Sequence, residues 1–91
     1  MEKELLIEKL QKIGTNFQEN IECYLFGSAL YRNFPNDFDI LILYNETELL
    51  TNVKSELKSI EIFPPLHLNY FTFKEEMELN FIEQQNAVRI F

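Results

Sequence analysis

The sequence FGSALYRNFPNDFDILIL, residues 26–43, joins two apolar stretches and contains the most informative side chains of the chain. Successive residues of a strand point to opposite faces, so Asp37 and Asp39 are expected on one face and Phe38 on the other. Carboxylate oxygens are the ligands that Mg²⁺ prefers in proteins. We therefore expect Asp37 and Asp39 to bind a metal ion at the start of a strand.

Gly27 and Ser28 end the preceding apolar stretch, residues 21–26, which has the composition of a strand. Glycine has no Cβ to keep a phosphate away from the main chain, and Ser28 is expected to be the N-cap of a short helix, residues 29–32. Amide groups at a helix start favour anions. A phosphate bound at Gly27 and Ser28 would complement a metal ion held by the two aspartates.

These residues resemble the signature of the minimal nucleotidyltransferases of the DNA polymerase β-like superfamily. That signature is an apolar strand, Gly-Ser, a short helix and Asp-x-Asp at the start of another strand. In this chain Gly27-Ser28 is followed by eight residues and then by Asp37-Phe38-Asp39. The intervening segment is slightly shorter than is common in the family and lacks its usual midway glycine. The resemblance extends, in the order of expected elements, over nearly the whole chain.

The resemblance implies a third acidic metal ligand on the next apolar strand, residues 65–71, and the matching position is His67. In the family this acid takes the proton of the attacking hydroxyl, so its replacement puts full activity in question. An imidazole can also act as a base near neutral pH. Asn69, on the same strand face, offers a neutral oxygen. The alternative is that His67 is a structural residue between two leucines.

The remaining pattern predicts helices packed against these strands. The first helix ends near Gly14. The second is capped by Asn45, and Pro64-Pro65 gives an extended entry to the third strand. The tail, residues 82–91, is expected to be helical. The apolar stripe of the first helix contains Leu6, Leu10, Ile13 and Phe17, and that of the second contains Leu49 or Leu50, Val53, Leu57 and Ile60.

Thr72 and Glu75 have the spacing of a capping box at the start of a further helix that bears Phe73, Met77 and Phe81. The whole pattern predicts a single α+β (α/β) domain, residues 1–91, with a small mixed β-sheet and the nucleotidyltransferase fold. Its helices are expected on one sheet face and the aspartates with His67 on the other. The acidic residues near the last helices are expected to form a surface or partner-facing patch: Glu75, Glu76, Glu78 and Glu83.

Composition restricts the classes of partner. The 91 residues carry a formal net charge of −7, which disfavours nucleic acid as a partner. A targeting signal and an apolar segment long enough for a membrane are lacking, so we expect a cytoplasmic protein without a membrane partner. Cys23, the single cysteine, is expected to be a small buried hydrophobic residue. Arg32 is a candidate phosphate contact, although loop arginines are often simply solvated.

Two functions of different classes fit these residues. The resemblance implies a metal-dependent nucleotidyltransferase that moves AMP from ATP, or another nucleoside monophosphate from its triphosphate, to a hydroxyl with the aid of Mg²⁺. Small members of the family are antitoxins that bind and modify a helical HEPN-domain toxin, so such a partner, or a homo-oligomer that completes the site, is expected. Its catalytic residues are Asp37, Asp39 and His67, with phosphate contacts from Gly27, Ser28 and Arg32.

The second function is a catalytically impaired module of the same fold that neutralises or scaffolds a protein partner through contacts alone. The absence of the third carboxylate favours this non-catalytic function, and exposed aromatic residues would form its binding surface. A third interpretation is an unrelated α+β domain, because Gly-Ser after a strand and Asp-x-Asp after Pro-Asn are also common loop sequences. The aromatic candidates for an interface are Phe34, Phe63, Phe81 and Phe91.

Overall fold

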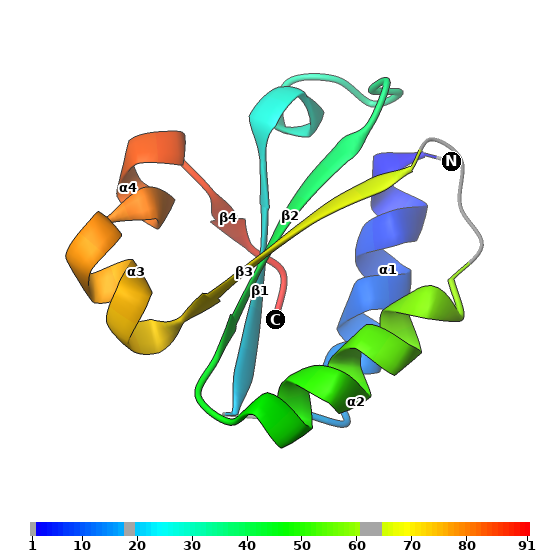
Figure 1. Ribbon diagram of the computed structural model, residues 1–91. Helices are drawn as coiled ribbons and strands as arrows, with labels where there is room; N and C mark the ends of the chain where they lie inside the picture. The colour runs from blue at the N-terminus through cyan, green and yellow to red at the C-terminus, as the bar shows by residue number, and fades with distance from the viewer. Residues whose placement is uncertain (1, 18–19, 61–64) are drawn as a thin grey trace.

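A computed structural model describes residues 2–17, 20–60 and 65–91 of the chain (Figure 1). The described residues form one sheet with helices on both of its sides. The elements in chain order are α1 (Lys3–Gly14), β1 (Ile21–Phe26), the 3-10 helix η1 (Gly27–Leu30), β2 (Phe38–Tyr44), α2 (Thr47–Lys58), β3 (Leu66–Thr72), α3 (Phe73–Leu79), α4 (Phe81–Gln85) and β4 (Val88–Arg89).

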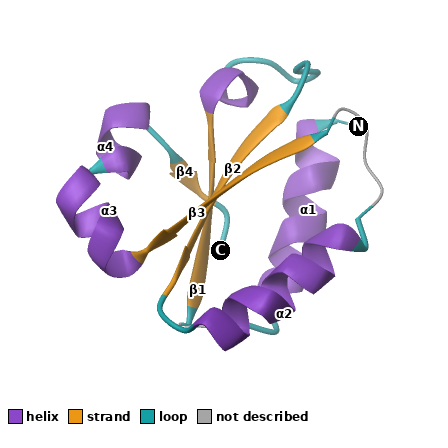
Figure 2. Cartoon of the chain, viewed as in Figure 1, coloured by secondary structure: helices purple, strands orange, loops and turns teal. Residues whose placement is uncertain are grey.

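The sheet has the strand order β3-β2-β1-β4. Its strands are drawn in orange in Figure 2. Strand β1 runs antiparallel to β2 and β4, whereas β3 runs parallel to β2. The registers pair Asp39 with Phe26 on one side and with His67 on the other. The predicted α+β class with a small mixed sheet is confirmed, and the two neighbouring strands of the prediction are indeed paired.

Helices α1 and α2 cover one face of the sheet (Figure 1). Their apolar stripes pack against Phe38, Ile40 and Ile42, the alternate residues of β2 that point to this side. The predicted amphipathic helices are therefore confirmed, and Leu50 rather than Leu49 is the fully packed leucine of α2. The buried helix residues are Leu6, Leu10 and Ile13 of α1 and Leu50, Val53 and Leu57 of α2.

Helices α3 and α4 lie on the opposite side of the sheet (Figure 1). The expectation of helices on one face alone therefore holds for α1 and α2 but not for this pair. The physical reason is that β2 is apolar on both faces, so buried Leu41 and Leu43 also require cover. Phe81 supplies part of that cover, because its ring meets those of Phe26 and Phe71 edge-on at centroid distances of 5.0 and 5.4 Å.

The tail, predicted to be helical over residues 82–91, is helical only to Gln85. Asn86 adopts the left-handed conformation, with φ of 52°, which ends α4. Val88–Arg89 then pairs with Tyr24 and Leu25 of β1 as an edge strand. Beyond it, Ile90 is buried in the main core. Apolar residues at the chain end thus favour sheet pairing and burial over an exposed helical turn.

Two predicted helix caps are wrong, and one is confirmed. Helix α2 begins after Glu46 rather than Asn45, and Ser28 lies inside η1, whose N-cap is Phe26. At α3 the capping box is present: the Glu75 amide donates to Thr72 Oγ1 at 3.0 Å and the Thr72 amide donates to Glu75 Oε1 at 2.9 Å.

The predicted stripe of α3 is also partly wrong, because Met77 is exposed and the left-handed Asn80 places Phe81 in the next helix. The expectation for Pro64 lies outside the described residues. Among the described helices, none combines the length and the apolar character that a bilayer span requires.

Candidate metal centre

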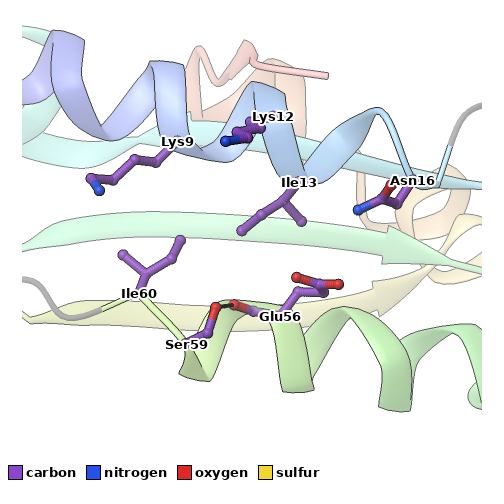
Figure 3. A pocket seen from close by; sticks show the side chains of 7 residues that line it. All are labelled: Lys9, Lys12, Ile13, Asn16, Glu56, Ser59 and Ile60. Atoms are coloured by element: carbon purple, nitrogen blue, oxygen red, sulfur yellow. Dashed lines mark hydrogen bonds between the residues drawn. The ribbon is translucent and has the colours of Figure 1, made fainter.

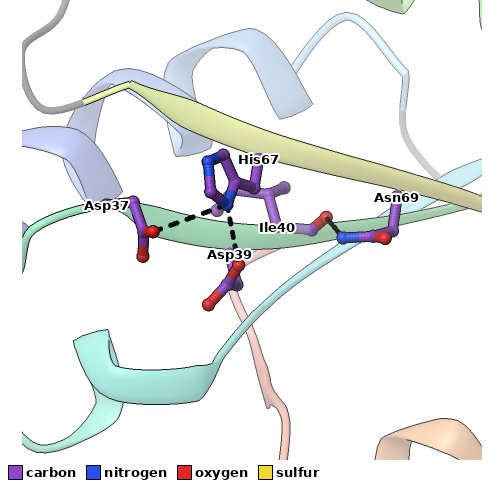
Figure 4. Close-up of polar contacts among 5 residues, drawn as sticks. All are labelled: Asp37, Asp39, Ile40, His67 and Asn69. Atoms are coloured by element: carbon purple, nitrogen blue, oxygen red, sulfur yellow. Dashed lines mark hydrogen bonds and ion pairs between the residues drawn. The ribbon is translucent and has the colours of Figure 1, made fainter.

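Asp37, Asp39 and His67 come together at the end of the sheet where β2 and β3 begin (Figure 4). Asp39 is the second residue of β2, and Asp37 directly precedes that strand. His67 is the second residue of β3, directly paired with Asp39 by the parallel register. The three side chains predicted from the sequence to form the site are therefore neighbours in space.

Core packing fixes the direction of the two aspartates. Phe38 and Ile40 are fully buried against α1 and α2, so their neighbour Asp39 must point to the opposite face. The Phe38 amide donates to the Pro65 carbonyl at 3.2 Å, which aligns the starts of the two strands. The rigid strands, and not the loops, therefore hold Asp39 beside His67.

The imidazole lies midway between the carboxylates. His67 Nδ1 is 3.5 Å from Asp37 Oδ2 and 3.5 Å from Asp39 Oδ1. Both distances exceed the range of about 2.7–3.2 Å for good N–H···O hydrogen bonds. One ligand atom from each residue lies within 4.8 Å of the others. Two carboxylate oxygens and one imidazole nitrogen that converge in this way fit a divalent cation.

The cluster is accessible from solvent. The side chains of Asp37 and Asp39 are 33% and 25% exposed, and that of His67 is 56% exposed. A cation held there would keep positions open to water or to a substrate oxygen, as catalytic metal sites do. Asn69 shares this strand face, but its Nδ2 donates to the Ile40 carbonyl at 3.4 Å. Figure 4 shows its amide engaged there, so the structure does not bring Asn69 into the cluster.

Gly27 lies against Asp39 from the β1 side. Its φ of 76° is left-handed, and an added Cβ would overlap the Asp39 carboxylate. The prediction that the backbone turns sharply at Gly27 is confirmed. Ser28 follows on the exposed surface. The residues expected to hold a phosphate therefore begin directly beside the residues expected to hold a metal ion.

Arg32 lies on the exposed loop between η1 and β2, and within the described parts of the chain it forms no ion pair. The same loop carries two aromatic side chains that are strongly exposed, Tyr31 at 80% and Phe34 at 74%. Phe34 is among the interface aromatics that the sequence predicts, whereas Tyr31 is not, since the sequence places it in the short helix of residues 29–32. Phe81 and Phe91 are partly buried, and Phe63 lies outside the described residues.

Three of the acidic residues after β3 make hydrogen bonds within the segment that contains α3 and α4. Glu75 completes the capping box, and the Glu76 carboxylate accepts from the amides of Phe81 and Ile82 at 3.2 and 2.9 Å. Asn80 Nδ2 donates to Glu83 Oε2 at 2.9 Å. The predicted surface position is confirmed for the three exposed residues Glu75, Glu78 and Glu83, whereas Glu76 is partly buried. Three of the four also make helix-capping or local contacts.

A hollow between α1 and α2 lies on the far side of the sheet from the carboxylates (Figure 3). The site residues predicted from the sequence take no part in it. The residues that line the hollow are Lys9, Lys12, Ile13, Asn16, Glu56, Ser59 and Ile60.

Lys54, in α2, places its Nζ 4.6 Å from the centre of the Tyr70 ring, a cation–π contact.

No protein-family model matches the chain, and a search of curated proteins found no significant match.

Proposed function

We propose that this protein is a metal-dependent nucleotidyltransferase that transfers a nucleoside monophosphate, AMP from ATP in the simplest case, to a hydroxyl group. The observation that carries the proposal is the register that aligns Phe26, Asp39 and His67 across three adjacent strands. This register places the Gly27 turn, the two carboxylates and the imidazole at one end of one sheet face. It is the arrangement that the Gly-Ser and Asp-x-Asp signature of the resembled family requires.

Asp37 and Asp39 would hold a divalent cation, Mg²⁺ in the family that the chain resembles, and His67 contributes a third donor. The bound cation would neutralise triphosphate charge and so favour departure of pyrophosphate. The donor set supports this role, because a cation would offset the repulsion between two carboxylates on one strand face. Partial burial of both aspartates strengthens their interaction with a cation relative to fully solvated groups.

The Gly27 backbone would bind the phosphates next to the cation. Because Gly27 has no Cβ, the Asp39 carboxylate lies directly against its backbone, so a phosphate bound beside this turn would be within reach of a cation on Asp39. The exposed Ser28 hydroxyl is free to rotate toward the same phosphate. Arg32 is exposed on the neighbouring loop, and its guanidinium would add a charge-assisted hydrogen bond to the phosphate from the solvent side.

The proton of the acceptor hydroxyl would pass to solvent, because an imidazole that binds the cation through Nδ1 carries its hydrogen on Nε2 and cannot also act as the base. In the reaction, the hydroxyl oxygen forms a bond to the α-phosphorus, the bond from that phosphorus to the bridging oxygen breaks, and its electrons leave with pyrophosphate. The cluster is open to solvent, so an incoming hydroxyl can reach the cation position and water can take up its proton.

The acceptor is proposed to be a hydroxyl on a protein. The site is open, and the exposed Tyr31 and Phe34 lie on the loop that leads to Asp37, where a partner surface would dock. A helical HEPN-type toxin, as in the resembled antitoxins, is one such partner, and a second copy of the chain is another.

A second candidate is the non-catalytic module that binds a protein partner. The specific observation in its favour is that His67 replaces the acid that the family uses as base. In this case Tyr31 and Phe34 would carry the contact, and nucleotide would be bound weakly or not at all. Transfer activity separates the two functions.

The direct test uses ATP labelled in the α-phosphate. The purified protein is incubated with a divalent cation, labelled ATP and a protein extract from its source cells, beside an Asp39→Asn variant. We expect label on a protein acceptor with the unchanged chain, and at least about a hundredfold less with the variant, because a metal ligand is lost. Absence of any labelled product, or equal labelling by both proteins, contradicts transferase activity.

A further inference from the structure

The donor set contains an imidazole, and this changes which cation the site should prefer. Mg²⁺ favours oxygen ligands, whereas imidazole nitrogen favours Zn²⁺ and its first-row neighbours. His67 Nδ1 faces both carboxylates at the same distance, 3.5 Å. It therefore occupies a ligand position and not a place at the edge of the cluster.

The spacing points the same way. For metal–ligand bonds of about 2.1 Å, neighbouring ligands of a tetrahedral zinc site lie about 3.4 Å apart. Neighbouring ligands of an octahedral Mg²⁺ site, with bonds of about 2.0–2.1 Å, lie only about 2.9 Å apart. The nitrogen-to-oxygen distances of 3.5 Å match the tetrahedral edge more closely. Small side-chain rotations suffice for the two aspartate oxygens, since all three ligand atoms lie within 4.8 Å.

We propose that Asp37, Asp39 and His67 form a two-carboxylate, one-histidine site that binds a first-row transition-metal cation, Zn²⁺ or Co²⁺ in type, more tightly than Mg²⁺. The fourth position, on the solvent side, holds water or a substrate oxygen. This deepens the proposed function by naming its cation, and it rests on that function only in using the same three residues. Binding of the metal alone, without nucleotide, tests it.

The chain is well suited to such a test. His67 is its only histidine and Cys23 its only cysteine. Cys23 is fully buried on the core side of β1, so a cation added to the folded protein cannot reach the thiol. No other histidine therefore competes for the cation, the one thiol is out of its reach, and the imidazole NMR signals belong to one residue.

The experiment titrates Zn²⁺, Co²⁺ and Mg²⁺ separately into the metal-free protein and follows heat and the imidazole NMR signals. The variants are His67→Asn, which removes the ligand, and His67→Asp, which provides a third carboxylate. Because His67 is more than half exposed, both variants are expected to fold, and circular dichroism checks this. Asp39→Asn is a third variant that leaves the imidazole in place.

We expect one Zn²⁺ or Co²⁺ per chain, with perturbed His67 signals. Loss of even an outer partner of a metal site costs about 10–100-fold in affinity, so His67→Asn and Asp39→Asn should each weaken Zn²⁺ binding at least tenfold. His67→Asp should move the preference toward Mg²⁺. Tighter binding of Mg²⁺ than of Zn²⁺ by the unchanged chain, or Zn²⁺ affinity unaffected by His67→Asn, overturns the proposal.

Failure of this inference is distinct from failure of the proposed function. Selective Zn²⁺ binding without any nucleotide transfer contradicts the transferase alone. Transfer that is best supported by Mg²⁺ and survives His67→Asn contradicts the zinc-type site alone.

Discussion

The Asp39 carboxylate lies so close to the Gly27 backbone that no side chain would fit at position 27. They are twelve positions apart in sequence and are joined by the antiparallel register that pairs Phe26 with Asp39. The left-handed φ of Gly27 and the position of the Asp39 carboxylate, a proposed metal ligand, are therefore one structural feature. A change at the turn should be felt at the metal site.

Gly27→Ala tests this coupling. The added methyl overlaps the Asp39 carboxylate and occupies a backbone conformation that costs L-residues about 1–2 kcal/mol. We expect a loss of about that size in the free energy of unfolding, measured with urea, and weaker cation binding measured by calorimetry. Ser28→Ala, at the adjacent exposed position, is the control and should change neither quantity. Unchanged cation affinity in Gly27→Ala would show that the turn and the carboxylate are independent.

Glu76 should stabilise the junction of α3 and α4. Its carboxylate accepts from two amides at the start of α4, at 3.2 and 2.9 Å, and so acts as a cap from the preceding helix. Glu76→Ala is expected to reduce the free energy of unfolding by about 1 kcal/mol, as loss of an N-cap does. Glu78→Ala removes an exposed carboxylate two positions away and should change it by less than about 0.5 kcal/mol. Equal effects of the two substitutions would remove the capping role of Glu76.

Alkaline pH should destabilise the protein through Cys23. Burial raises the pKa of its thiol from 9.0 to about 12, so the folded chain holds the thiol proton more tightly than the unfolded chain. This contribution is complete below about pH 9 and is lost as pH rises from 9 toward 12, at up to about 1.4 kcal/mol per pH unit. Tyr24, whose pKa burial and its bond to Glu22 raise from 10.0 to about 12, adds a second decline above pH 10.

The comparison with Cys23→Ala isolates the thiol. Urea unfolding from pH 7 to pH 10 should show a difference between the two proteins that is constant to about pH 9 and then shrinks, while the Tyr24 decline is common to both. The folded thiol should also resist disulfide reagents at pH 8. A difference that stays constant through pH 10, or rapid modification of the folded protein, would contradict the buried state of Cys23.

Residue pattern predicted the sheet and the strand face that carries the candidate metal ligands because both depend on local alternation. Phe38 and Ile40 identify the core face of β2, and the opposite direction of Asp39 follows from the pleat. The pairing of Asp39 with His67 also required the parallel register, which the sequence order of a strand, a helix and a strand indicates. These features use short-range periodicity, and the structure agrees with them.

Sequence patterns failed where tertiary contacts decide. Residues 88–91 were expected to be helical, but β1 had a free edge, and pairing with Tyr24 and Leu25 satisfies the backbone there. The position of α3 and α4 depends on Phe81 meeting Phe26 and Phe71, three residues that are distant in sequence. Neither contact leaves a signal in a local window.

The most direct test of the account is calorimetric titration of ATP into the protein with and without a divalent cation, with Zn²⁺ and Mg²⁺ tried in turn. The matched control carries Asp37→Asn and Asp39→Asn, which keep the side-chain shape and remove the charge. We expect one ATP bound per chain, only when a cation is present, and no binding by the control. The central claim is that these aspartates hold the cation that binds the nucleotide donor. ATP binding that needs no cation, or that persists in the control, would contradict it. So would the absence of binding by ATP and every other nucleoside triphosphate under all conditions.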